Sequence, residues 1–151
     1  METDHLEGMN IRWTPGGDRI VYVRGGSNGY NQVVSAATGI PTGKVKLRHI
    51  TEEEANSTDV HVSPNGKMVT FMSDRSGHAD FKRMDVWIAP VDGGEAQNMT
   101  PNTMEHYDYR PRWSPDGKKL VFTSDRTGWR NVGVIDIGTG KTSMVTWSLF
   151  D

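Results

Sequence analysis

A serine flanked by glycines matches the pattern from which many hydrolases build their nucleophile. Residues 25–29 read GGSNG, which fits G-x-S-x-G with Ser27 in the place of the attacking residue. That pattern yields a nucleophile where a strand turns sharply into a helix and where an acid and a histidine follow along the chain. The residues after Ser27 read as a strand. We therefore expect Ser27 to be a turn residue.

Two other groups of residues resemble sites for phosphate and for metal. Gly140-Lys141-Thr142 matches the end of a phosphate-binding loop, but Ile135 stands where the pattern needs its first glycine. No pair among the 5 histidines has the i, i+4 spacing of a known metal site. The chain has 0 cysteines, which excludes disulfides and thiolate chemistry. We expect no catalytic residue, no metal and no cofactor.

Composition narrows the class of protein further. The 151 residues suffice for one ordinary domain with its own core. With 17 basic and 19 acidic residues the net charge is −2, so a nucleic-acid surface gains no support. No stretch approaches the ~20 apolar residues of a membrane-spanning helix, and residues 1–10 do not read as an export signal. We expect neither nucleic-acid binding nor membrane insertion.

The chain contains an internal repeat, and the strands and turns of that repeat determine where the side chains of any site lie. Three segments align without gaps: NIRWTPGGDRIVYVRGGSNG (10–29), DVHVSPNGKMVTFMSDRSGH (59–78) and RPRWSPDGKKLVFTSDRTGW (110–129). Pro15, Pro64 and Pro115 anchor a Ser/Thr-Pro-x-Gly turn that recurs about every 50 residues. The turn suits a tight hairpin, since proline presets φ and glycine permits a positive φ. In this alignment Ser27 falls on a turn position that the other two segments fill with Ser76 and Thr127.

Each unit reads as four short antiparallel strands. An apolar run rich in β-branched and aromatic residues follows the first turn, and the Ser-Asp-Arg-Ser/Thr-Gly turns at 73–77 and 124–128 follow that run. Asp74 and Asp125 are expected to bond backbone N–H groups within each unit, with Arg75 and Arg126 packing nearby. No segment has helical periodicity, and we interpret residues 51–56 as a loop.

Four-stranded units that repeat at this period are typical of β-propeller blades. We expect an all-β fold with three tandem four-stranded antiparallel blades. The predicted boundaries are an N-terminal tail at 1–8, blades at 9–51, 52–100 and 101–146, and a further strand or tail at 147–151.

The segment WSPDGKKLVFTSDRTG (113–128) resembles the PD40, or TolB-like, propeller repeat. The resemblance covers residues 9–146 and is strongest in the third unit. Similar repeats occur in TolB-like proteins, in tricorn-type and prolyl-oligopeptidase-type peptidases, and in oligogalacturonate lyases. Resemblance to TolB implies a protein partner and a periplasmic setting.

Three blades are too few for a closed ring, because propellers close with roughly four to eight. One solution is that the chain is a part of a longer propeller. The other is self-association, in which two copies form a six-bladed ring with twofold symmetry.

Departures from the repeat are the better candidates for function. The segment 105–110 concentrates aromatic and charged groups just before the inner strand of the third unit. Its candidate binding residues are His106, Tyr107, Asp108 and Arg110. A second departure is the insert 78–84, which places Phe81, Lys82 and Arg83 on a loop. Aromatic and arginine side chains are common anchors of protein interfaces.

These observations favour a non-catalytic module that binds a protein or peptide. The alternative is a propeller segment of a prolyl-oligopeptidase-type serine peptidase, or of another enzyme, whose catalytic domain lies elsewhere. A third alternative is a propeller similar to the sugar-acid lyases, which would need clustered histidine and acidic ligands.

Overall fold

A computed structural model describes residues 9–41, 43–76, 83–101 and 106–147. Within these ranges the chain forms three four-stranded antiparallel sheets and no helix. Blade 1 contains β1 (Met9–Trp13), β2 (Arg19–Gly25), β3 (Asn31–Ala37) and β4 (Arg48–His49). Blade 2 contains β5 (Ser57–Val62), β6 (Met68–Ser73), β7 (Asp85–Pro90) and β8 (Gln97–Asn98). Blade 3 contains β9 (Asp108–Trp113), β10 (Lys119–Ser124), β11 (Asn131–Asp136) and β12 (Thr142–Met144).

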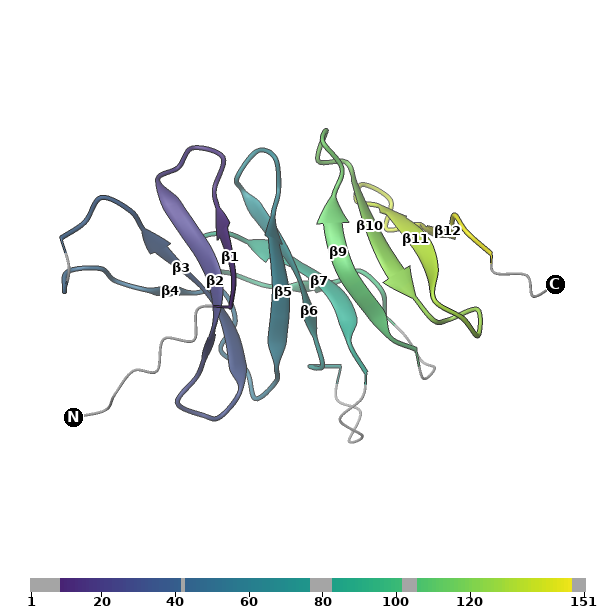
Figure 1. The fold of residues 1–151 in the computed structure, drawn as a ribbon, viewed down its shortest axis with the longest axis horizontal. Helices are drawn as coiled ribbons and strands as arrows, with labels where there is room; N and C mark the ends of the chain where they lie inside the picture. Colours follow the sequence, from purple (N-terminus) through teal and green to yellow (C-terminus); the bar gives the residue numbers. More distant parts are fainter. Residues whose placement is uncertain (1–8, 42, 77–82, 102–105, 148–151) are drawn as a thin grey trace.

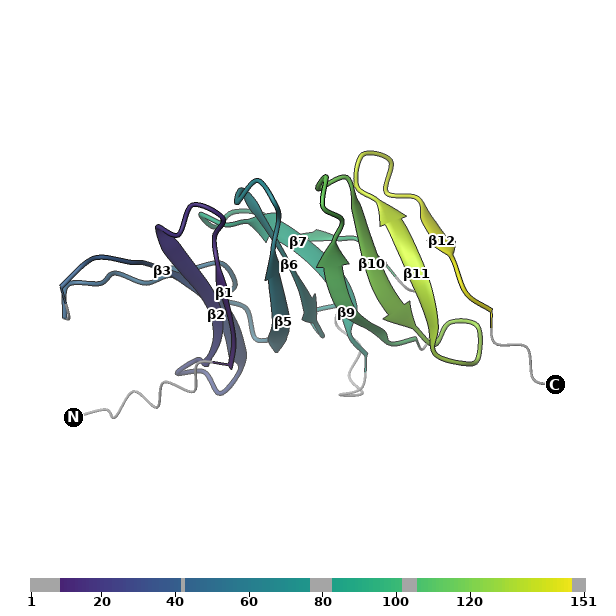
Figure 2. The ribbon, with the colours of Figure 1, turned by 45° about the horizontal axis from the view of Figure 1, so that its top comes forward.

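The expected all-β class and the three tandem blades are confirmed. In each blade the strands pair in chain order, as a meander. The blades stand in a row, and the first strands β1, β5 and β9 lie side by side in both views (Figures 1 and 2). These three are the inner strands. No described residue belongs to a helix long and apolar enough to cross a bilayer.

The repeated turns fold as their sequence predicts. In blade 3 the Ser114 N–H donates to the Lys119 carbonyl at 2.9 Å, and the Gly117 N–H donates to the Ser114 carbonyl at 2.9 Å. Gly117 has a φ of 70°, which side chains rarely adopt. The Ser114 hydroxyl donates to Asp116 at 2.6 Å, and this bond is the main reason that the pKa of Asp116 lies below its ordinary value. The predicted tight hairpin is confirmed.

The Ser-Asp-Arg turns hold each blade together. Asp74 accepts the Asn56 N–H at 2.7 Å, and Asp125 accepts the Tyr107 N–H at 2.8 Å. The Arg75 guanidinium lies 4.7 Å from the centre of the Trp87 ring. The prediction that these turn residues serve their own blades is confirmed.

Neighbouring blades pack face to face through apolar side chains. Between blades 1 and 2 the core includes Val21, Val33 and Phe71, and between blades 2 and 3 it includes Ile88 and Phe122. Each fully buried side chain of this size contributes roughly 1.5–3 kcal/mol. Because strand residues alternate between two faces, every blade presents one face to the blade before it and the other to the blade after it.

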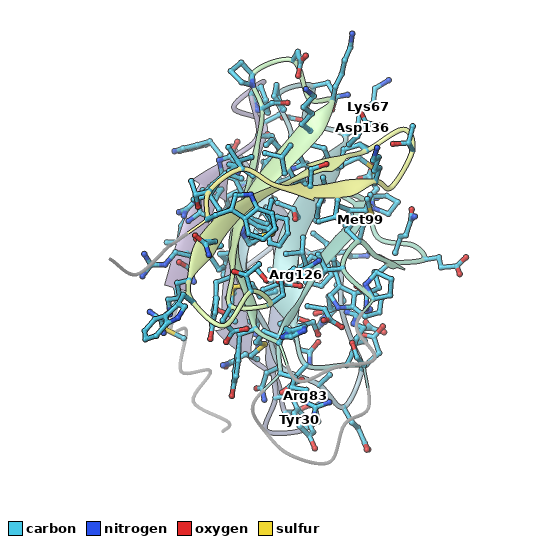
Figure 3. The ribbon with its side chains drawn as sticks, turned by 90° about the vertical axis from the view of Figure 1, so that its right-hand side faces the viewer. Tyr30, Lys67, Arg83, Met99, Arg126 and Asp136 are labelled. Atoms are coloured by element: carbon cyan, nitrogen blue, oxygen red, sulfur yellow. The ribbon has the colours of Figure 1, made fainter. Side chains whose placement is uncertain are left out.

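The two end faces have no neighbouring sheet among the described residues. On blade 1 the outer face carries a cluster of Tyr22, Val34 and Ala36. On blade 3 the outer face, which Figure 3 views directly, leaves Val121 39% and Val145 60% exposed. Exposed apolar surface of this kind is often a site of interaction in proteins.

Candidate binding site at the inner strand of blade 3

Each inner strand begins with a β-bulge that the sequence pattern did not reveal. The bulge residues are Asn10, Asp59 and Arg110, with φ of 57°, 50° and 52°. They occupy the same position in the three aligned repeats. Asn and Asp tolerate a positive φ, whereas Arg adopts it rarely, and backbone strain gathers at functional sites. Arg110 is therefore the most unusual of the three.

Arg110 lines a cavity on the open face of blade 3. The cavity has a volume of about 310 Å³, and its other lining residues are Tyr109, Thr123 and Arg130. Tyr109 and Thr123 are register partners on β9 and β10, so their side chains share one face of the sheet. The fold thus brings two arginines and a tyrosine to the edge of the inner strand.

The lining residue Tyr109 stacks on the ring of Tyr107. The Tyr107 and Tyr109 rings are nearly parallel, at 2°, with centroids 5.4 Å apart. The Arg130 guanidinium lies 5.4 Å from the centre of the Tyr109 ring. Burial raises the pKa of Tyr109, and the Asp125 carboxylate raises it further, so the phenol stays neutral and can donate a hydrogen bond.

The other predicted residues of this segment play different parts. Asp108 is fully buried, and its Oδ2 accepts from Arg126 Nη2 at 2.7 Å. Burial raises the pKa of Asp108, while the Ser124 hydroxyl and the Arg126 charge oppose that shift. His106 Nδ1 lies 3.9 Å from Asp125 Oδ1. Asp108 therefore stabilises the blade from inside. Of the four predicted residues only Arg110 lines the cavity, and Tyr107 stacks on its lining residue Tyr109.

The predicted loop residues are only partly described. Arg83 lies just before β7, at the end of the blades opposite the turn that contains Lys67 (Figure 3). It does not line the cavity. Phe81 and Lys82 lie outside the described residues.

A charged pair joins the inner strands of blades 2 and 3. Arg112 donates from Nη1 and Nη2 to the two oxygens of Asp59, at 3.1 and 3.0 Å. Beside this pair the Trp113 indole N–H donates to the His61 carbonyl at 3.2 Å, and the Trp113 backbone N–H donates to His61 Nδ1 at 3.3 Å. Burial lowers the pKa of His61, and the Arg112 and Arg12 charges lower it further.

The hydrolase-like motif lies elsewhere, in a turn. The Gly26 N–H donates to the Tyr30 carbonyl at 2.7 Å, and the Gly29 N–H donates to the Gly26 carbonyl at 3.0 Å, so Ser27 lies between strands β2 and β3. The turn interpretation of Ser27 is confirmed. In the part of the chain that the structure describes, no three His, Asp or Glu side chains are grouped as metal ligands.

Sequence reasoning did not name Tyr109 as a candidate, although it lies in the segment 105–110. It also missed four residues outside that segment: Thr123, Arg130, Asp59 and Arg112. A comparison of equivalent repeat positions could have found Asp59 and Arg112, because a charged residue in an otherwise conserved strand pattern is visible in the alignment. Thr123 and Arg130 give no such signal, since they join the site only through strand pairing.

Both the sequence and the fold of this chain are similar to those of known proteins. The TolB beta propeller domain model, PD40, matches residues 3–151. The uncharacterized peptidase YuxL of Bacillus subtilis is 31% identical over an alignment of 116 residues, and the match covers 74% of this chain and 16% of YuxL. The Tol-Pal system protein TolB of Francisella tularensis is 32% identical over 80 residues, which are 52% of this chain and 17% of that protein.

The solved structure of TolB from Acinetobacter baumannii has the same fold, with a TM-score of 0.69 at 23% identity, and the match covers 97% of this chain and 34% of that one. The chain thus spans only a small part of the length of its curated relatives. Because the family model covers nearly the whole sequence and the three blades match a TolB propeller, this chain belongs to the TolB β-propeller domain family.

Proposed function

We propose that this chain is a non-catalytic propeller segment that binds a protein or peptide at the inner-strand edge of blade 3. The observation that supports the proposal most directly is the cavity lined by Tyr109, Arg110, Thr123 and Arg130. Aromatic and arginine side chains around a cavity are the usual anchors of a protein interface. The similarity to TolB, a protein named for the Tol-Pal system, agrees with a protein partner.

The chemistry of the cavity favours an acidic ligand. Two guanidinium groups, of Arg110 and Arg130, flank it, and neither has a carboxylate within salt-bridge distance among the described residues. An arginine pairs with a carboxylate through two parallel hydrogen bonds, which fixes both position and orientation. The stacked tyrosines add an apolar surface for the ligand's side chains.

Selection from a displayed library of random peptides tests this role. We expect enriched peptides to contain Asp or Glu, and their affinity to fall at least about tenfold on Tyr109→Ala. Tyr30→Ala, which removes a tyrosine from the β2–β3 turn of blade 1, is the matched control and should change nothing. Peptides that bind equally well to wild type and Tyr109→Ala would refute this site.

A second candidate follows from the similarity to YuxL. In this alternative the chain is part of the propeller of a serine peptidase whose chemistry is carried out by another domain. Reading the gene beyond codon 151 tests it: a second G-x-S-x-G followed by an acid and a histidine would support the peptidase. A reading frame without them would contradict it.

A further inference from the structure

At the interface between blades 2 and 3 an ion pair joins the inner strands. Asp59, the bulge residue of blade 2, binds Arg112, which stands two residues after the bulge of blade 3. The pair is partly buried, with the side chains of Arg112 and Asp59 35% and 16% exposed. At this interface the bulge residue of one blade thus faces the residue two positions after the bulge of the next, and this correspondence defines a positional rule.

The corresponding positions at the interface between blades 1 and 2 carry no pair of opposite charges. There the bulge residue is Asn10, and the residue two positions after the next bulge is His61. His61 has a lowered pKa because of burial and the neighbouring arginines, so it is neutral near pH 7. Both corresponding positions are therefore uncharged, and His61 Nδ1 accepts the Trp113 backbone N–H of blade 3.

At the two open ends, the bulge position of blade 3 and the position two residues after the bulge of blade 1 both carry a positive charge. At the end of blade 3 the bulge residue is Arg110, and at the start of blade 1 the residue two positions after the bulge is Arg12. Arg12 is oriented as Arg112 is: its Nη1 donates to the carbonyl of Ile11 at 2.9 Å, as Arg112 Nη1 donates to that of Pro111 at 2.8 Å. No described carboxylate forms an ion pair with Arg12 or Arg110.

The open face of blade 3 is built like the faces that are covered. Val145 aligns with Ile50 and Met99, which are 5% and 3% exposed beneath their neighbouring blades, whereas Val145 is 60% exposed. The cavity corresponds to a site that is filled in blade 2. There Met72, the equivalent of Thr123, is contacted by the Arg110 backbone, whose N–H lies 3.3 Å from the sulfur.

The Ser/Thr-Pro-x-Gly turns also pack on one another from blade to blade. A Cβ built on Gly66 would lie 3.2 Å from Pro15 Cδ, and one built on Gly117 would lie 3.6 Å from Pro64 Cδ, so each turn proline packs on the turn glycine of the next blade. The corresponding proline of blade 3 is Pro115, at the open end. It is placed to pack on the glycine of one more turn.

We propose that the open face of blade 3 receives another blade of this repeat, and that Arg110 selects one with a carboxylate two residues after its bulge. A second copy of this chain does not meet the requirement, because its blade 1 would place Arg12 against Arg110. The pairing of like charges prevents two copies from closing a six-bladed ring head to tail. This inference rests on the proposed binding role of the same cavity, and it names the partner.

A charge reversal at Arg110 tests the rule with the chain as its own probe. Arg110→Asp would recreate the Asp59–Arg112 pair between copies, since the new carboxylate would face a preoriented Arg12. We expect wild type to be monomeric and Arg110→Asp to form a two-copy assembly, measured by light scattering and sedimentation at matched concentrations. The double variant Arg12→Asp/Arg110→Asp restores like charges and should be monomeric again.

Two controls separate charge from other effects. Arg110→Asn relieves the same positive-φ strain as Arg110→Asp but supplies no carboxylate, so we expect it to associate at least about tenfold more weakly. Lys67→Asp makes the same charge change on an exposed turn of the middle blade and should resemble wild type. Trp13, 63% exposed, should become buried only in the assembly, as Trp113 is at 9%, which its fluorescence reports.

The inference is overturned if wild type already forms a two-copy ring that buries Trp13, or if Arg110→Asp associates no more tightly than Arg110→Asn. Its failure is distinguishable from failure of the proposed function. Peptide binding lost on Tyr109→Ala would still support a binding site when the charge rule fails, and a charge-dependent ring would support the rule when no peptide is selected.

Discussion

The ion pair between Asp59 and Arg112 should stabilise the blade 2–blade 3 interface more than an ordinary surface pair would. We consider the cycle of Asp59→Ala, Arg112→Ala and the double variant, each unfolded in urea. The cycle isolates the pairwise free energy from the effects of each truncation. Both oxygens of Asp59 are engaged, at 3.1 and 3.0 Å, so the geometry is bidentate.

The expected magnitude follows from the burial of the pair. Two unit charges about 4 Å apart attract by about 4 kcal/mol at an effective dielectric constant of 20. Desolvation and the ordering of two long side chains oppose this gain, and fully exposed pairs retain only about 0.2–1 kcal/mol. Because these side chains are 35% and 16% exposed, we expect an intermediate coupling, about 1.5 kcal/mol of unfolding free energy.

The pair between Arg48 and Asp92 is the matched control. Arg48 joins blade 1 to blade 2 through one contact of 3.0 Å to Asp92, with side chains 56% and 62% exposed, and the same Asp92 oxygen also accepts from Arg19 at 3.2 Å. Its coupling should be below about 0.5 kcal/mol. If the two cycles give the same coupling, the Asp59–Arg112 pair is no better than a surface contact, and the pairing rule across inner strands loses its energetic basis.

Three further predictions concern residues that shape the blades. Because the pKa of His61 is lowered in the folded protein, the unfolded chain binds a proton at this residue more readily. The contribution of His61 to the free energy of unfolding should therefore be constant well above pH 6.5 and fall as the pH drops through 6.5. His61→Gln should remove this part of the pH dependence in urea titrations. Gly133→Ala should cost about 1–3 kcal/mol, because the new Cβ would lie 2.6 Å from the Phe122 ring, whereas Gly25→Ala, with nothing within 4 Å, serves as control in thermal unfolding. Ser27→Ala should change stability by less than about 0.5 kcal/mol and leave any hydrolytic activity of a longer parent protein unchanged; loss of activity with intact folding would contradict the turn assignment.

The repeat predicted the architecture because its signals are local. Proline and glycine at fixed spacing specify a hairpin within a few residues, and Ser114 through Gly117 fold as that spacing requires. The strand that follows needs only its apolar alternation to choose a buried face. Such local rules are repeated three times in this chain, and each copy supports the interpretation of the others.

The site could be predicted only in part, since it depends on contacts between blades. Arg110 was a candidate because it lies in a charged segment, yet nothing local shows that it occupies a bulge with a positive φ. A bulge adds one residue to one strand and so shifts the alternation that a sequence pattern follows. Asp108, from the same segment, points into the blade and binds Arg126, while the side chain of Tyr109 lines the open face.

The contrast between the apolar and charged positions explains how one repeat can specify an order of blades. Apolar residues such as Val33, Val86 and Val132 recur at the face toward the next blade, so they would accept any neighbour of the same repeat. The bulge residues differ instead, as Asn, Asp and Arg. Because a mismatched charge at a partly buried contact is costly, these positions discriminate between neighbours that the apolar faces treat alike. Specificity between blades therefore resides in the inner-strand residues that depart from the repeat, and Arg110 is the one whose counterpart is still to be identified.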